Sequence, residues 1–136
     1  MEIAEAIDFI RSSHRAVLAT LRRDGSPQLT PVAATVADDG MVVVSSRETA
    51  AKVINLRRDA RAWLTVMNDG FYGNFVQVEG PVTIVSLPEA MDGLVDYYRS
   101  ISGEHPDWDD YRGAMEAERR VLIKIDVTRA GPNFMG

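Results

Sequence analysis

Three Asp-Gly pairs divide the first half of the chain into short apolar segments. The pairs stand at residues 24–25, 39–40 and 69–70, and the segments beside them are rich in valine, alanine, leucine and threonine. Asp-Gly between two such segments is a strong signal for a β-hairpin. The pattern predicts an antiparallel sheet that closes, or nearly closes, into a barrel. The expected strands are residues 16–21, 27–36, 41–46, 62–67, 71–85 and, near the end of the chain, 121–127; the first three are expected to form a meander.

Two of these strands carry residues that restrict pairing. Pro31 has no N–H group to donate, so its strand is expected to be an edge or to carry a bulge there. Gly73 and the Gly80-Pro81 pair are expected to bend the long strand 71–85. A polar or kinked edge at Gln28, Thr30 and Pro31 leaves backbone groups free for a ligand.

Helices are expected to flank the strands. Isoleucines spaced at i, i+4 and i+7 predict an amphipathic helix over residues 2–12. A Ser-Leu-Pro-Glu sequence at 86–89 has the form of a capping box and predicts a helix that begins there. Another helix is expected from Pro106 onward, with Asp109 and Asp110 at the favourable end of its dipole.

The third strand runs directly into a short basic helix, which Thr49 is expected to cap. Lys52 and Asn55 follow at i+3 and i+6 and form a polar stripe with Thr49. Five basic residues lie between positions 47 and 61 against two acidic ones, in a chain of net charge −5. This local excess indicates an anion-binding site. The alternative, which we hold equally open, is an ordinary surface helix, because arginines near a helix C-terminus are favoured by the dipole whatever the function.

Composition excludes several classes of protein. The 136 residues fit one domain, 1–136, with one core. The chain has no cysteine, which excludes disulfides and thiolate metal sites. No apolar run approaches about 18 residues and the N-terminus is acidic, so we expect a soluble, cytoplasmic protein without a membrane partner. The net charge of −5 and pI near 5.0 argue against a nucleic-acid partner.

Catalytic side chains are not evident. Neither His14 nor His105 has a second ligand at metal-binding spacing, so no metal site is predicted. Asp109 and Asp110 are adjacent and therefore point in different directions on a helix. We also find no glycine-rich phosphate loop or dinucleotide fingerprint. Redox chemistry would require a bound cofactor, since none of these side chains accepts a hydride.

Three segments together resemble a known group of proteins: residues 18–29, residues 51–61, and residues 98–112 with 118–122. The chain resembles the split-barrel flavin-binding superfamily that includes pyridoxamine 5'-phosphate oxidase. More narrowly, it is similar to the deazaflavin-dependent branch that uses coenzyme F420. The resemblance implies a mainly β fold with flanking helices, a six-stranded antiparallel split β-barrel. It also implies a homodimer whose cofactors lie in grooves at the subunit interface.

The resemblance further implies which residues contact the cofactor. The phosphate-binding lysine of the family falls on Lys52 and a second basic contact falls on Arg120, while Arg47 stands near a position where some relatives carry an arginine. Pro31 replaces an asparagine of some relatives, so a backbone contact to the ring is expected there. The complete set of implied cofactor-binding residues, with Asn55 from the polar stripe, is Gln28, Thr30, Pro31, Val32, Ser45, Ser46, Arg47, Lys52, Asn55 and Arg120.

The activity implied is hydride transfer between F420 and a small organic substrate, with no catalytic side chain assigned. Two alternatives remain open: an FMN-dependent enzyme of the pyridoxamine 5'-phosphate oxidase kind, and a non-catalytic carrier of F420 or flavin. Two roles are open for Phe71, Tyr72 and Phe75: they line the substrate side of the cofactor, or they pack as ordinary aromatic residues of a strand. Phe134 and Met135 are apolar, so the tail is expected to dock on the domain.

Overall fold

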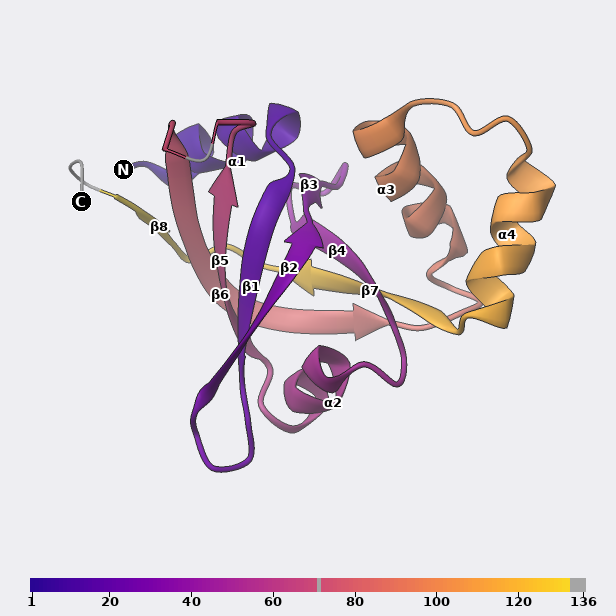
Figure 1. The fold of residues 1–136 in the computed structure, drawn as a ribbon, viewed down its shortest axis with the longest axis horizontal. Coiled ribbons are helices and arrows are strands. Elements are labelled where there is room, and N and C mark those ends of the chain that lie inside the picture. The colour runs from indigo at the N-terminus through magenta and orange to yellow at the C-terminus, as the bar shows by residue number, and fades with distance from the viewer. Residues whose placement is uncertain (71, 133–136) are drawn as a thin grey trace.

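The computed structural model describes residues 1–70 and 72–132, which form one strongly curled antiparallel sheet with helices around it (Figure 1). The strands are β1 (Arg15–Leu21), β2 (Pro27–Ala33), β3 (Thr35–Val36), β4 (Val42–Arg47), β5 (Arg61–Met67), β6 (Phe75–Val85), β7 (Arg120–Ile125) and β8 (Arg129–Gly131). The helices are α1 (Ile3–Ser12), α2 (Ala51–Arg58), α3 (Met91–Ser102) and α4 (Trp108–Ala117).

The strand order β2-β1-β5-β6-β7-β4-β3 makes this sheet a split barrel. All pairs are antiparallel, and β8 pairs with β6 outside this path. The first part of β6 pairs with β5 and its last part with β7, so β6 belongs to both halves. Among the described residues no ladder joins β2 to β3 or β4, which leaves the split. The expected antiparallel split barrel with flanking helices is therefore confirmed; its six long strands are present, and short β3 and β8 add to them.

Residues of alternate strand positions fill the barrel, and helices close its ends. Ile10 of α1 and Val53 and Leu56 of α2 are buried in the same cluster as the inward valines and leucines of the strands. A second cluster lies outside the barrel, where α3 and α4 cover Val43 and Leu122. In Figure 1 these two helices stand together on one side, and α2 lies below the sheet.

The bend of β6 predicted at Gly80-Pro81 lies where the strand changes partners. Gly73 was also expected to bend this strand, but it lies in the turn before β6. A Cβ atom on Gly80 would come within 1.8 Å of the backbone oxygen of Asp126. The N–H of Asp126 also donates to the carbonyl of Pro81 at 3.0 Å. Only glycine allows this close approach, so the curl of the sheet depends on the identity of residue 80.

The expected three-stranded meander is wrong. β1 and β2 form the first hairpin, but the chain leaves that sheet at Ala34, and the next two residues pair with β4 instead. The second hairpin is therefore short, and β4 takes β7 as its long neighbour. Turn residues specify each hairpin locally, whereas the choice of distant partner depends on packing. β2 ends the strand order, as Pro31 predicted.

Three expected helix starts are shifted. Ala50 is the N-terminal cap of α2, and Thr49 makes no capping hydrogen bond. Residues 86–90 form a turn before α3, because Pro88 disfavours a helical conformation in the residue before it. Asp107 caps α4 by accepting from the N–H of Asp110 at 3.1 Å, which leaves Pro106 outside the helix.

The described residues contain no helix long and apolar enough to cross a bilayer. The expectations for Phe71, Phe134 and Met135 lie outside the described residues.

Candidate functional site

A cluster of cations lies where β4 ends and α2 begins; we call it the cationic notch and define it as Arg47, Lys52 and Arg120. The strand register sets Arg47 directly opposite Arg120, so the two side chains leave the same face of the sheet. Glu118 is the carboxylate that serves both: its Oε1 accepts from Nη2 of Arg120 at 2.8 Å and from Nη2 of Arg47 at 3.3 Å. One carboxylate therefore pairs with two of the three cations, and the cluster keeps an excess of positive charge.

Lys52 is the cation left over. Its side chain is half-buried, and among the residues that the structure describes it has no hydrogen bond or ion pair. Burial lowers the pKa of Lys52 below its ordinary value of 10.5, and the charge of Arg120 lowers it further. The other lysine, Lys124, is ion-paired with Asp39. A half-buried ammonium without a counter-ion is stabilised by an anionic ligand, so the donor set fits a phosphate or carboxylate group.

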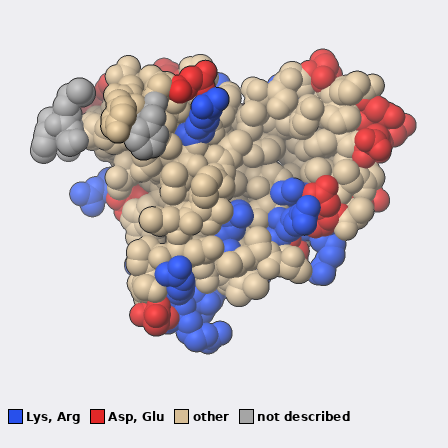
Figure 2. Space-filling view, in the orientation of Figure 1, with Lys and Arg blue, Asp and Glu red and all other residues tan. Residues whose placement is uncertain are grey.

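Basic side chains gather on one face of the molecule between α2 and the lower end of α4, as Figure 2 shows. This excess stands out because the whole chain carries a net charge of −5. The local positive field would attract an anion to this face.

Asn55 lies one turn after Lys52 on α2 and holds the helix to the sheet. Its Nδ2 donates to Thr20 Oγ1 and to Gln28 Oε1, both at 3.1 Å, and its Oδ1 accepts from Arg58 at 3.0 Å. Asn55 is 7% exposed, so these bonds use its polar atoms inside the protein. Its contribution to a cofactor site through a direct contact stays a prediction.

The predicted residues of β2 divide between two faces. Gln28, Thr30 and Val32 are half-buried, while Leu29 and Pro31 are exposed on the opposite face. β4 divides the same way: Ser45 lies on the face of Arg47, and Ser46 is buried within the barrel, 2% exposed. The structure thus brings Ser45 into the neighbourhood of the notch, and directs the side chains of Pro31 and Ser46 elsewhere.

Tyr97 of α3 is a residue of this region that the sequence did not indicate. Its hydroxyl donates to the carbonyl of Ala33 at 2.7 Å, at the end of β2. Burial raises the pKa of Tyr97, while a hydrogen bond from the backbone of Ser45 and the charge of Arg120 oppose that rise. Tyr97 therefore connects β2 with β4 across the split. The only available signal was a tyrosine at a helix position, which does not identify a partner 64 residues away.

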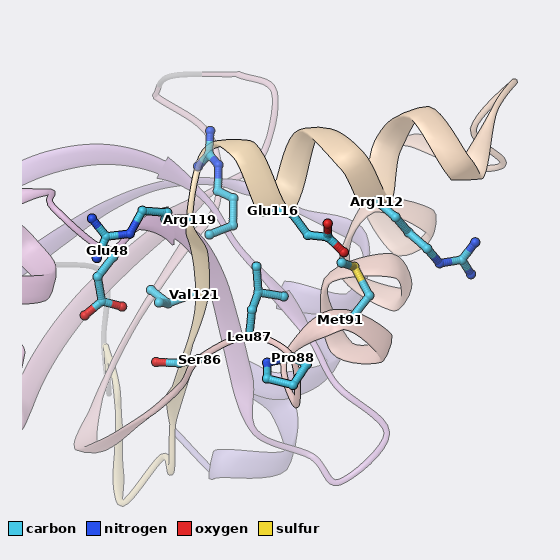
Figure 3. A pocket seen from close by; sticks show the side chains of 10 residues that line it. Glu48, Ser86, Leu87, Pro88, Met91, Arg112, Glu116, Arg119 and Val121 are labelled. Atoms are coloured by element: carbon cyan, nitrogen blue, oxygen red, sulfur yellow. The ribbon is translucent and has the colours of Figure 1, made fainter.

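A cavity of about 720 Å³ adjoins the notch and shares Arg120 with it (Figure 3). It lies between α4, the turn before α3 and the start of β7. Its lining residues are Glu48, Ser86, Leu87, Pro88, Met91, Arg112, Glu116, Arg119, Arg120 and Val121. The sequence did not indicate this cavity, because its walls come from four separate parts of the chain.

The histidines make structural contacts. Nδ1 of His14 lies 2.8 Å from the carbonyl oxygen of Ala34. His105 packs against Tyr98, Trp108 and Tyr111, with ring centroids 5.0 to 5.7 Å from its own. Within the described part of the chain no three His, Cys, Asp or Glu residues are grouped so as to hold a metal ion.

This chain matches a known family. Residues 3–133 match the family model described as pyridoxamine 5'-phosphate oxidase, and the chain belongs to that family. Among solved structures, the chain is similar to a conserved hypothetical protein, Rv2991, from Mycobacterium tuberculosis. That match has 28% identity and a TM-score of 0.78, and it covers all of this chain and 92% of the other.

Two further structures share the fold at 18% identity. One is an F420 reductase, with a TM-score of 0.70 over 91% of this chain and 94% of the other. The second is a heme binding protein from Mycobacterium smegmatis, with a TM-score of 0.67 over 95% of this chain and 51% of the other. Similarity at 18% identity shows that the chain shares the fold of these proteins. The match to the family model places the chain in an oxidoreductase-like superfamily.

Proposed function

We propose that this protein is an oxidoreductase that binds coenzyme F420 and uses it to reduce or oxidise a small organic substrate. The observation that carries the proposal is Lys52: a half-buried ammonium, beside Arg120, without an acidic partner among the described residues. F420 supplies a deazaflavin that carries a hydride and a tail that carries phosphate and carboxylate groups. The name of one structural neighbour, an F420 reductase, supports the choice of cofactor.

The protein's own groups would bind and position the cofactor. Lys52, Arg47 and Arg120 would neutralise the anionic tail, and Ser45 stands beside them. Gln28, held by Asn55, and Thr30 would line the ring along the free edge of β2, where Pro31 and Val32 offer backbone groups. Because β2 ends the strand order, those backbone groups are not used by another strand.

A homodimer is part of the proposal. The outward positions of β2, β1, β5 and the start of β6 form an outer face with an apolar part: Leu29, Pro31, Val17, Ala19, Trp63, Met67 and Phe75. The same face also carries the polar residues Arg15, Thr65, Gln77 and Glu79. Leu29 is 64% exposed. An antiparallel sheet that faces water usually has polar residues on that side. An apolar outer face is better explained by a second copy of the chain, which would also complete the groove along β2.

The test is to titrate the purified protein with F420 and with FMN and to follow cofactor fluorescence. We expect saturable quenching of F420. Lys52→Ala should weaken binding by about 1.5–3 kcal/mol, roughly 10- to 150-fold, the range for a hydrogen bond to a charged group. Lys124→Ala is the matched control, because that lysine is paired with Asp39 away from the notch, and it should bind F420 normally.

The same titrations separate the alternatives. Tight FMN binding without F420 binding would replace the proposal with an FMN-dependent enzyme. F420 binding without oxidation of the reduced cofactor by any of a panel of quinones and enones would indicate a carrier. Binding by Lys52→Ala equal to that of the wild type would place the tail elsewhere.

A further inference from the structure

The cavity beside the notch combines an apolar floor with a cationic end. Leu87, Pro88 and Met91 provide the floor, between α4 above and the start of the turn at residues 86–90 below (Figure 3). Glu48 and Arg119 lie at one end, and Arg112 lies at the other. A volume of about 720 Å³ is within the usual range for sites that bind small molecules.

The charges at the Arg119 end are unequally matched. Glu48 is already held by Arg57, with Arg57 Nη2 2.7 Å from its Oε1. Arg120 shares Glu118 with Arg47. The guanidinium of Arg119 has no ion pair or hydrogen bond among the residues that the structure describes. This end therefore has a solvent-exposed arginine without an ion pair, next to apolar surface.

The opposite end is balanced. Arg112 lies 3.8 Å from the exposed carboxylate of Asp109, and Glu116 follows one turn later on α4. An anionic group is therefore favoured at the Arg119 end and not at the Arg112 end.

The backbone of Arg119 gives a second, independent observation. Its φ angle is +53°, and it is the one non-glycine residue with positive φ in the described part of the chain. It immediately follows Glu118, the C-terminal cap of α4, at the position where glycine is strongly preferred. An arginine held in this conformation is strained, and backbone strain of this kind clusters at functional sites.

We propose that this cavity binds a small organic anion, with its carboxylate or similar group at Arg119 and its apolar body over Leu87, Pro88 and Met91. The site adjoins the notch and shares Arg120 with it, but its anion-binding residue is a different arginine, Arg119. It does not depend on which cofactor the notch binds.

Decanoate, used below its micellar concentration, is a suitable probe because it has one carboxylate and an apolar chain. Titration into ¹⁵N-labelled protein should shift the amide signals of Leu87, Met91 and Val121 in a saturable way. Arg119→Gly removes the guanidinium and relieves the positive-φ strain, so the variant should fold at least as well as the wild type. Its decanoate affinity should fall roughly ten-fold.

Two variants serve as controls. Arg119→Lys keeps a positive charge and should retain most of the affinity, while Arg129→Ala removes an exposed arginine of β8, outside the cavity lining, and should change nothing. A folded Arg119→Gly variant that binds decanoate as the wild type does would overturn the proposal, and so would shifts confined to other residues.

A further experiment distinguishes ligand binding in this cavity from cofactor binding at the notch. Lys52→Ala should leave decanoate binding unchanged even where it abolishes F420 binding. If F420 displaces decanoate from these residues, the cavity belongs to the cofactor, and the proposal of a separate site fails.

Discussion

At the scale of single residues, the proposed role of Lys52 predicts that cofactor binding depends on pH. Burial and Arg120 lower its pKa below 10.5, so the folded protein loses this proton at a lower pH than the unfolded chain. Between the two pKa values the unfolded chain binds more protons, and the stability of the free protein therefore rises with pH in that range. An anionic ligand requires the charged lysine and should bind less tightly as pH rises through the same range.

The measurement is the dissociation constant of F420 at fixed ionic strength from neutral to alkaline pH. Affinity should fall for the wild type and stay level for Lys52→Arg, whose guanidinium keeps its charge. Tyr111 does not interfere, because burial raises its pKa to about 12. A parallel decline in both proteins would assign the pH dependence to another group.

A substitution at Asn55 tests whether the side-chain amide of this residue holds α2 to the sheet. Asn55→Ala removes its bonds to Thr20, Gln28 and Arg58, and leaves the hydroxyl of Thr20 buried with a weaker partner. We expect a loss of about 2–3 kcal/mol in the free energy of unfolding, measured with urea. Asn74→Ala, at an exposed position before β6, should change stability by less than about 0.5 kcal/mol. Equal stabilities for the two variants would contradict this role.

At the scale of elements, the bend of β6 depends on Gly80. Gly80→Ala would place a Cβ atom 1.8 Å from the carbonyl oxygen of Asp126, which is backbone and cannot rotate away. We expect a loss of about 3 kcal/mol or more in thermal or urea unfolding.

Gly113→Ala is the control for that substitution. Gly113 lies on α4, where an added Cβ meets no atom within 4 Å, so the change should stabilise the protein by up to about 1 kcal/mol. A Gly80→Ala variant as stable as the wild type would show that β6 can bend without this contact.

Elements were predictable where the signal is local. The Asp-Gly pairs identified the hairpins β1–β2, β3–β4 and β5–β6, and Gly25 and Gly40 have positive φ angles in the first two turns. Pro31 correctly indicated an edge. The start of α3 was predicted too early, because the Ser-Leu-Pro-Glu pattern satisfies a capping rule while Pro88 favours a turn. The partners of β4 were not predictable, since nothing local to residues 41–46 specifies a strand at residues 120–125.

At the scale of the whole molecule, the candidate site was predictable only in part. The basic helix and its lysine follow from charge and spacing, and the register places Arg120 beside them. Tyr97 and the cavity at Arg119 were not predictable, because they arise from contacts between elements far apart in sequence. The unusual φ angle of Arg119 is a property of the folded helix end and has no signal in sequence composition.

The apolar outer face gives the last prediction. The register aligns Leu29, Ala19 and Trp63 in one row across β2, β1 and β5, so a single charge at Leu29 would enter the proposed paired surface at the β2 end of that row. Light scattering coupled to gel filtration should give twice the chain mass of 15.0 kDa for the wild type. Leu29→Asp should shift the equilibrium toward the monomer by at least ten-fold, since burial of an unpaired carboxylate costs more than 1.4 kcal/mol, as an order of magnitude.

Ile54→Asp is the matched control for that change, because Ile54 is 55% exposed on α2 and lies off the outer face. It should leave the dimer intact. If the proposed groove along β2 needs the second subunit, Leu29→Asp will also weaken F420 binding although it does not touch Lys52, and raising the protein concentration will restore that affinity. A monomeric wild type that binds F420 fully would remove the dimer from the mechanism while leaving the notch in place.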